Sequence, residues 1–238
     1  KSVPFHHPLI VADQMVQLDH MTRGRVMFGA GPGALPTDAY QLGIEPNAQR
    51  RRMTEALDAI IPLMEGETVN METDWFTLKN AKLQLGSYTR PTMEMAVTSV
   101  RSPSGALCAG KFGAGLLVLG GVSDEALERQ SENWQICEET AKKNSKSVHR
   151  RQWRITVMTH LAESIDQAKK DLDFGLQKWV NYSHEVLPNS PFPRTEKDPL
   201  NWGIENKVLV VGTPDDVIKE IKRVQDLTGG FGVYLLFA

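Results

Sequence analysis

Apolar residues in this chain alternate between short continuous runs and stripes that recur every three or four residues. Continuous runs rich in aliphatic and β-branched residues predict buried strands, and the recurring stripes predict helices that bury one face. The predicted strands cover residues 25–28, 94–98, 116–119, 154–161 and 231–237. The predicted helices cover residues 8–22, 50–64, 102–112, 123–142, 164–182 and 213–228. Buried strands that alternate with crossover helices form a parallel sheet, so the pattern predicts an α/β fold.

Three segments fall outside this alternation. Residues 34–49 contain Pro36 and Pro46 and show no apolar period, and residues 186–206 hold four of the thirteen prolines. Both are predicted to be long loops, and loops of this length in a compact domain usually serve function. Residues 74–78 and 81–85 predict the two strands of a hairpin.

A glycine-rich turn follows the first predicted strand. Gly29, Gly31 and Gly33 remove three Cβ atoms where the strand would emerge, so a ligand can approach the backbone. In α/β proteins ligands bind at the carboxyl ends of strands. A dinucleotide fingerprint is disfavoured, because it requires a helix to start within the glycines and Pro32 and Pro36 interrupt that segment. A cofactor wall and a plain turn both remain open.

A second candidate site joins the strand at 94–98 to the next helix. Free backbone N–H groups and the helix dipole favour an anion there, and the hydroxyls of Ser99, Ser102 and Ser104 with the charge of Arg101 suit a phosphate monoester. The simpler interpretation is that Ser102 caps the helix and Arg101 points into water. The pair Gly120–Gly121 ends the following strand as an adjoining wall or as a simple turn.

Composition narrows the functional classes. The 238 residues are 41% hydrophobic with a formal net charge of -2, which suits one globular domain and gives no support for nucleic-acid binding. No apolar run has the length that spans a bilayer. Cys108 and Cys137 lack CxxC spacing, so a disulfide or metal site is not predicted, and a reducing cytoplasm is the expected location.

His160 lies on a strand with no neighbouring carboxylate pattern. The sequence has no HExxH or GxSxG motif.

Several motifs in order resemble one family. They are His6-His7-Pro8-Leu9, the segment Leu18-Asp19-His20-Met21-Thr22-Arg23-Gly24-Arg25, Phe28-Gly29-Ala30-Gly31-Pro32-Gly33, Ser102-Pro103, the segment from Ala109 to Gly115, and Gly212-Thr213-Pro214-Asp215-Asp216. Together they resemble the flavin-dependent, bacterial-luciferase-like monooxygenases, and most closely the limonene monooxygenase-like branch. The resemblance implies a (β/α)8 TIM barrel, with residues 1–238 forming a single, partial barrel domain. The first two strands with their helices and the last helix would be absent from this chain.

The resemblance also implies a chemistry. Reduced FMN, supplied by a separate flavin reductase, would react with O2 to give a C4a-peroxyflavin, which transfers one oxygen atom to a small apolar, terpene-like substrate. The protein would position the flavin and keep water away. A homodimer is expected. Two alternatives remain: a deazaflavin-dependent oxidoreductase of the same barrel family that transfers hydride, and a barrel that binds flavin without catalysis.

The resemblance assigns roles to particular residues. His7 is the catalytic candidate, because a histidine after the third barrel strand faces the flavin in this family. The cofactor-binding candidates are Gly31, Gly33, Thr98, Ser99, Arg101, Ser102, Ser104, Gly120 and Gly121. Because Pro32 stands where some members carry an arginine near the phosphate, Arg101 is the expected source of that charge. The substrate-pocket candidates are Leu35, Tyr40, Phe192 and Trp202, with residues 186–206 as a lid.

Overall fold

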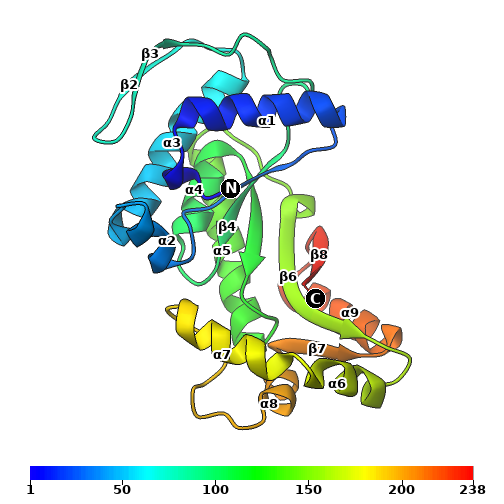
Figure 1. The fold of residues 1–238 in the computed structure, drawn as a ribbon. Coiled ribbons are helices and arrows are strands. Elements are labelled where there is room, and N and C mark those ends of the chain that lie inside the picture. Colours follow the sequence, from blue (N-terminus) through cyan, green and yellow to red (C-terminus); the bar gives the residue numbers. More distant parts are fainter. Residues whose placement is uncertain (238) are drawn as a thin grey trace. The chain divides into compact units, whose positions relative to one another are not determined.

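In the computed structural model, which describes residues 1–237, contacts divide the chain into one unit of Lys1–Thr98 and a second that starts at Ser99 (Figure 1). Within both units parallel strands alternate with helices, which confirms the predicted α/β class. The single barrel domain predicted over residues 1–238 stays a prediction. None of the helices in this described part is long and apolar enough to cross a bilayer.

Two helices pack against each other in the core of the first unit. The 3-10 helix η1 (Val3–Phe5) leads into α1 (Pro8–Thr22), which starts at a proline as predicted and ends before a left-handed Arg23. α1 packs on α3 (Gln49–Met64). Val11 and Val16 on α1 and Leu57 and Ile60 on α3 are almost fully buried.

The segment at 34–49 is more regular than predicted. It contains α2 (Pro36–Gln41) and the 3-10 helix η2 (Pro46–Ala48). Both prolines occupy the first helical position, where the missing N–H costs nothing, so they begin helices here. The predicted loop is therefore wrong for these two short stretches.

The hairpin exists, but its strands lie elsewhere. β2 (Val69–Glu72) pairs antiparallel with β3 (Thr77–Ala81). Residues 74–75, predicted to start a strand, lie in the turn, because the Thr73 hydroxyl accepts hydrogen bonds from the backbone N–H of Trp75 (3.3 Å) and Phe76 (3.0 Å). A side chain that bonds to nearby backbone groups in this way favours a turn over a strand.

Two parallel strands position the glycine turn. β1 (Phe28–Ala30) pairs with β4 (Met95–Ser99) in the register Phe28↔Met95 and Ala30↔Val97. β1 therefore starts three residues later than the predicted strand at 25–28 and includes Gly29. Phe28 and Ala30 point to the buried face, so this shift keeps the large ring in the core.

The second unit contains a parallel sheet centred on β6 (Trp153–Leu161), a long bent strand in Figure 1. β5 (Gly115–Leu119) and β8 (Val233–Phe237) pair with its first half, and β7 (Leu209–Gly212) pairs with its end. β7 was not predicted, because its four residues run directly into the helix-start signal at Thr213. The other strands confirm the predicted positions to within two residues.

Six α-helices of the second unit lie within the described residues: α4 (Ser104–Phe112), α5 (Asp124–Lys143), α6 (Ile165–Asp173), α7 (Leu176–Val186), α8 (Pro199–Glu205) and α9 (Pro214–Thr228). The single helix predicted over 164–182 is wrong, because the chain breaks at Gly175. The loop predicted over 186–206 is wrong in its last part, where the Asp198 carboxylate accepts a hydrogen bond from the Asn201 N–H and Pro199 starts α8.

Local capping and tight packing hold these helices. At the start of α9 the backbone N–H and hydroxyl of Thr213 donate to Asp216, which lowers the pKa of that carboxyl. α4 packs closely on α5, and Trp134 of α5 stacks on Trp153 of β6 with ring centroids 5.3 Å apart. The two cysteines are buried and form no disulfide, and burial raises the pKa of the Cys137 thiol to about 12.

Candidate functional site

Gly31 and Thr98 meet at the carboxyl ends of β1 and β4. A Cβ on Gly31 would lie 2.9 Å from Oγ1 of Thr98, so no larger residue fits without displacing the threonine. On its other side Gly31 forms a parallel bridge with Ser2, and the Val3 N–H donates to the Gly31 carbonyl at 3.0 Å. The structure thus brings together one residue of the glycine-rich turn and one residue at the end of the strand that precedes the serine-rich segment.

The strand register places the candidate residues on two faces. Gly29 pairs with Ala96, so Gly29, Gly31 and Thr98 share one face. A Cβ on Gly29 would meet nothing within 4 Å, whereas the Thr98 side chain fills the space beside Gly31. Ser99 follows on the opposite face and is 3% exposed, and its hydroxyl has no hydrogen-bond partner among the described residues. A buried hydroxyl without a partner is uncommon and calls for an explanation.

Gly33 is explained by packing. Its φ of +92° lies in the region that favours glycine, and a Cβ there would come within 2.6 Å of the Phe5 ring and 2.7 Å of Nε2 of Gln49. That amide donates to the Pro32 carbonyl at 3.0 Å. The predicted cofactor role of Gly33 stays a prediction.

The serine-rich joint lies at the start of α4. Pro103 occupies the N-cap position, and no side chain caps the helix. The hydroxyls of Ser102 and Ser104 lie 2.8 Å apart, so Ser102 pairs with Ser104 and does not cap α4. The Arg101 side chain is exposed. The first amides of α4 and this hydroxyl pair together offer donors suited to an anion.

The turn after β5 has its own support. Gly121 adopts a φ of +72°, and its carbonyl accepts a hydrogen bond from Nε2 of Gln130 at 2.8 Å. Oε1 of Gln130 is buried without a partner among the described residues. Gly120 is exposed, as expected for a wall beside a ligand or for a simple turn.

The remaining candidates are more dispersed. His7 precedes α1, is exposed, and contacts the Phe76 ring edge-to-face with centroids 6.0 Å apart. Leu35 is half-buried before α2, whereas Tyr40 on that helix is 85% exposed. The pocket role of both residues stays a prediction.

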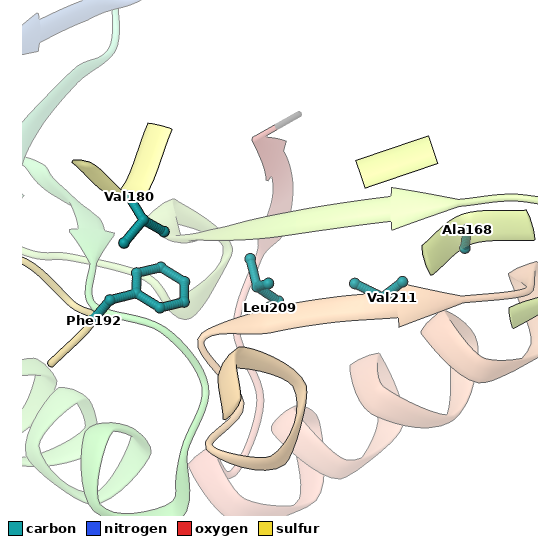
Figure 2. Close-up of a cluster of buried hydrophobic side chains, with 5 residues drawn as sticks. All are labelled: Ala168, Val180, Phe192, Leu209 and Val211. Carbon is teal, nitrogen blue, oxygen red and sulfur yellow. The ribbon is translucent and has the colours of Figure 1, made fainter. Parts of the chain in front are cut away.

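Phe192 and Trp202 belong to a packed aromatic cluster. Phe192 is 2% exposed, and its ring contacts Trp179 (centroids 5.9 Å apart) and Trp202 (5.6 Å). Figure 2 shows Phe192 facing Val180, with Leu209 projecting from β7 beside it. Phe192 therefore offers almost no surface to a ligand in this structure, and the pocket role of Phe192 and Trp202 stays a prediction.

The structure reveals one polar pair that the sequence did not. Nε2 of His160, at the end of β6, lies 3.0 Å from Oδ2 of Asp171 on α6. The sequence shows no carboxylate pattern beside His160, and the pair forms because the next helix folds back over the strand that carries the histidine. No short motif links the two residues, so local spacing gave no signal for the pair.

Each unit carries groups at its strand ends that suit part of a flavin mononucleotide: Gly31 and Thr98 in the first unit, and Ser99, Ser102 and Ser104 in the second. In the second unit, Ser99 offers a buried hydroxyl without a partner among the described residues, and Ser102 and Ser104 carry two more hydroxyls beside the first amides of α4. Hydroxyls, backbone N–H groups and one arginine form a donor set that recognises a phosphate monoester.

Comparison with known proteins decides the family. The family model described as luciferase-like monooxygenase matches residues 2–229. The chain belongs to the luciferase-like monooxygenase family. It is 42% identical to limonene 1,2-monooxygenase of Rhodococcus erythropolis, an alignment that covers 99% of this chain and 60% of the relative. It is 39% identical to 4-hydroxyprotoasukamycin monooxygenase of Streptomyces nodosus subsp. asukaensis, over 99% of this chain and 65% of that protein.

Solved structures support the luciferase-like TIM-barrel fold. A monooxygenase from Streptomyces bottropensis superposes with a TM-score of 0.84 at 19% identity, over 99% of this chain and 68% of that one. The oxygenating constituent of 3,6-diketocamphane monooxygenase from Pseudomonas putida, a type II Baeyer-Villiger monooxygenase in complex with FMN, gives 0.75 at 22% identity, over 99% and 70%. A family relative of another kind, the F420-dependent glucose-6-phosphate dehydrogenase of Microbacterium testaceum, is 30% identical over 50% of this chain and 35% of its own length.

Proposed function

We propose that this chain is the flavin-binding part of a reduced-FMN-dependent monooxygenase that inserts one oxygen atom from O2 into a small apolar, terpene-like substrate. The observation that carries the proposal is the segment leading into α4, where the buried Ser99 hydroxyl has no partner among the described residues and Ser102 and Ser104 present two more hydroxyls. Family membership and the two monooxygenase relatives support it. A separate flavin reductase and a second copy of the chain are the proposed partners.

In this proposal each part of the chain has a defined task. Ser99, Ser102 and Ser104 donate hydrogen bonds to the phosphate of FMN, and Arg101 neutralises its charge. Gly31 lets the flavin approach the strand ends. When bound, the reduced flavin supplies the electrons that activate O2. The chain binds and orients the cofactor and excludes water from it, which is why an apolar surround matters more here than a catalytic triad. His7 is the proposed catalytic side chain.

One alternative has support of its own. The F420-dependent relative suggests hydride transfer by a deazaflavin without oxygen chemistry. A flavin-binding barrel without turnover is the other alternative. Anaerobic reduction of FMN, followed by mixing with the chain, limonene as the probe and ¹⁸O2, separates the three. Incorporation of one ¹⁸O atom into an organic product supports the monooxygenase. Turnover with reduced F420 and no oxygen uptake supports the first alternative, and FMN binding without any product supports the second.

The phosphate site predicts a specific loss on removal of one hydroxyl. FMN and riboflavin differ only in the phosphate, so the chain is expected to bind FMN more tightly. Replacing Ser99 with alanine is expected to weaken FMN binding by about tenfold, the effect of one hydrogen bond to a charged group, and to leave riboflavin binding unchanged. Flavin fluorescence quenching measures both affinities.

Ser131→Ala is the matched control, because that hydroxyl donates only to the Leu127 carbonyl within α5. It is expected to leave both affinities unchanged. Equal losses of FMN and riboflavin binding in Ser99→Ala would show that Ser99 does not contact the phosphate.

A further inference from the structure

An apolar pocket of about 400 Å³ lies within the second unit. Its floor is a sheet face on which Met158 of β6 lies opposite Leu209 of β7, and His160 lies opposite Val211. Figure 2 shows Leu209 and Val211 on β7. α6 and α7 cover this face and contribute five further side chains or backbone segments to the lining. These are Leu172, Phe174, Gly175, Leu176 and Trp179.

Two features that the sequence did not predict form this pocket. β7 extends the sheet beside the end of β6, and the break at Gly175 lets α7 turn away from α6. The aromatic cluster of Phe192 and Trp202 packs behind Trp179 and supports that wall. Because the carboxyl end of β6 lies here, the pocket is at the edge of the sheet where ligands of barrel enzymes bind.

One hydrogen-bonded polar pair lines this apolar space. Nε2 of His160 is 3.0 Å from Oδ2 of Asp171, and Nε2 of Gln167 is 2.6 Å from the other carboxylate oxygen. Hydrogen bonds from His160 and Gln167 lower the pKa of Asp171, so the charged carboxylate is the acceptor and Nε2–H of His160 is the donor. In neutral His160 the other ring nitrogen, Nδ1, is then an acceptor, and it has no partner among the described residues.

We infer that this pocket binds the organic substrate of the proposed monooxygenase, or its oxygenated product, and that Nδ1 of His160 accepts a hydrogen bond from a hydroxyl on that molecule. The inference rests on the proposed function and adds the location and chemical class of the ligand. An apolar lining of this size with one fixed acceptor is typical of sites for small uncharged molecules, for which volumes of roughly 300–1,000 Å³ are usual. The charged Asp171 on the wall disfavours acids.

The test measures binding in the absence of flavin, so that it does not depend on turnover. The probes are limonene, which has no oxygen, and carveol, which has the same carbon skeleton with one hydroxyl. Calorimetric titration is expected to show carveol bound about three- to tenfold more tightly, the effect of one neutral hydrogen bond. Trp179 lines the pocket, so its emission is expected to shift on binding, and Trp179→Phe is expected to abolish that shift.

Three variants locate the interaction. His160→Phe keeps an aromatic ring without the acceptor and is expected to remove the preference for carveol while limonene binding stays within twofold. Phe174→Ala is expected to weaken both probes; Phe174 is 85% exposed, so its loss leaves the fold intact. Phe112→Ala, a half-buried phenylalanine at the end of α4, is the matched control and is expected to change neither affinity.

Two results would overturn the inference: no binding of either probe, or a carveol preference that survives in His160→Phe. Neither result affects the proposed function, because flavin binding and ¹⁸O incorporation are measured separately. Conversely, carveol binding with no ¹⁸O incorporation would leave this pocket assigned and the proposed oxygen chemistry rejected.

Discussion

Replacing Gly31 with alanine is expected to weaken FMN binding by at least about tenfold and to destabilise the first unit by about 1–3 kcal/mol. The added Cβ would lie 2.9 Å from Oγ1 and 3.4 Å from Cγ2 of Thr98, so either the Thr98 side chain or the backbone at residue 31 has to move. Gly29→Ala is the matched control on the same strand and face, because its Cβ would meet nothing within 4 Å. Flavin fluorescence gives the affinity, and urea denaturation gives the stability.

A double variant separates packing from cofactor contact. Thr98→Ala removes both atoms that the new Cβ would meet, so Gly31→Ala in that background is expected to cost little stability. If the flavin approaches the Gly31 backbone directly, Gly31→Ala still lowers FMN affinity there by a similar factor. If Gly31→Ala/Thr98→Ala binds FMN as well as Thr98→Ala alone, Gly31 serves packing only and the cofactor role is rejected.

The features that the sequence predicts well are those determined by neighbours in the chain. α1 begins at Pro8 and ends at Thr22 as predicted, and α9 begins with the Thr213–Asp216 capping box. Such signals depend on a few consecutive residues, so they predict helix ends without knowledge of the tertiary contacts. The meeting of Gly31 and Thr98 followed from a more general rule, since parallel strands end at the same edge.

The features that the sequence missed depend on partners distant in the chain. β7 has four residues and is a strand because the end of β6 offers it a free edge. His160 and Asp171 are paired because α6 folds back over β6. Apolar patterns also gave no means of telling that Phe192 packs behind a wall, since a buried ring and a pocket-lining ring look the same in sequence.

The candidate sites differ in how much of each was predictable. The glycine turn after β1 and the serine-rich segment before α4 were indicated by their motifs, because close backbone approach and phosphate donors require those residue types. The apolar pocket carries no such motif: Leu172, Leu176 and Leu209 are ordinary core residues by type. The pocket could therefore be recognised only from the structure, which shows β7 and the break at Gly175.

The largest loss of stability is expected at the crossing of α4 and α5. A Cβ on Gly110 would lie 2.5 Å from the Cys137 carbonyl oxygen and 2.6 Å from Cβ of Thr140. Backbone atoms cannot rotate away as a side chain can, so Gly110→Ala has to push the helices apart. We expect a loss of about 3 kcal/mol in the free energy of unfolding, measured by urea denaturation, and no single side-chain truncation on α5 that restores it.

Gly175→Ala is the matched control for this substitution. Gly175 has a φ of -129°, which alanine adopts without strain, and its Cβ would meet nothing within 4 Å. Because alanine restricts the unfolded chain more than glycine does, that variant is expected to be unchanged or more stable by up to about 1 kcal/mol. If Gly110→Ala and Gly175→Ala unfold at the same urea concentration, α4 and α5 can accommodate the added methyl group, and the close approach at Gly110 does not limit stability.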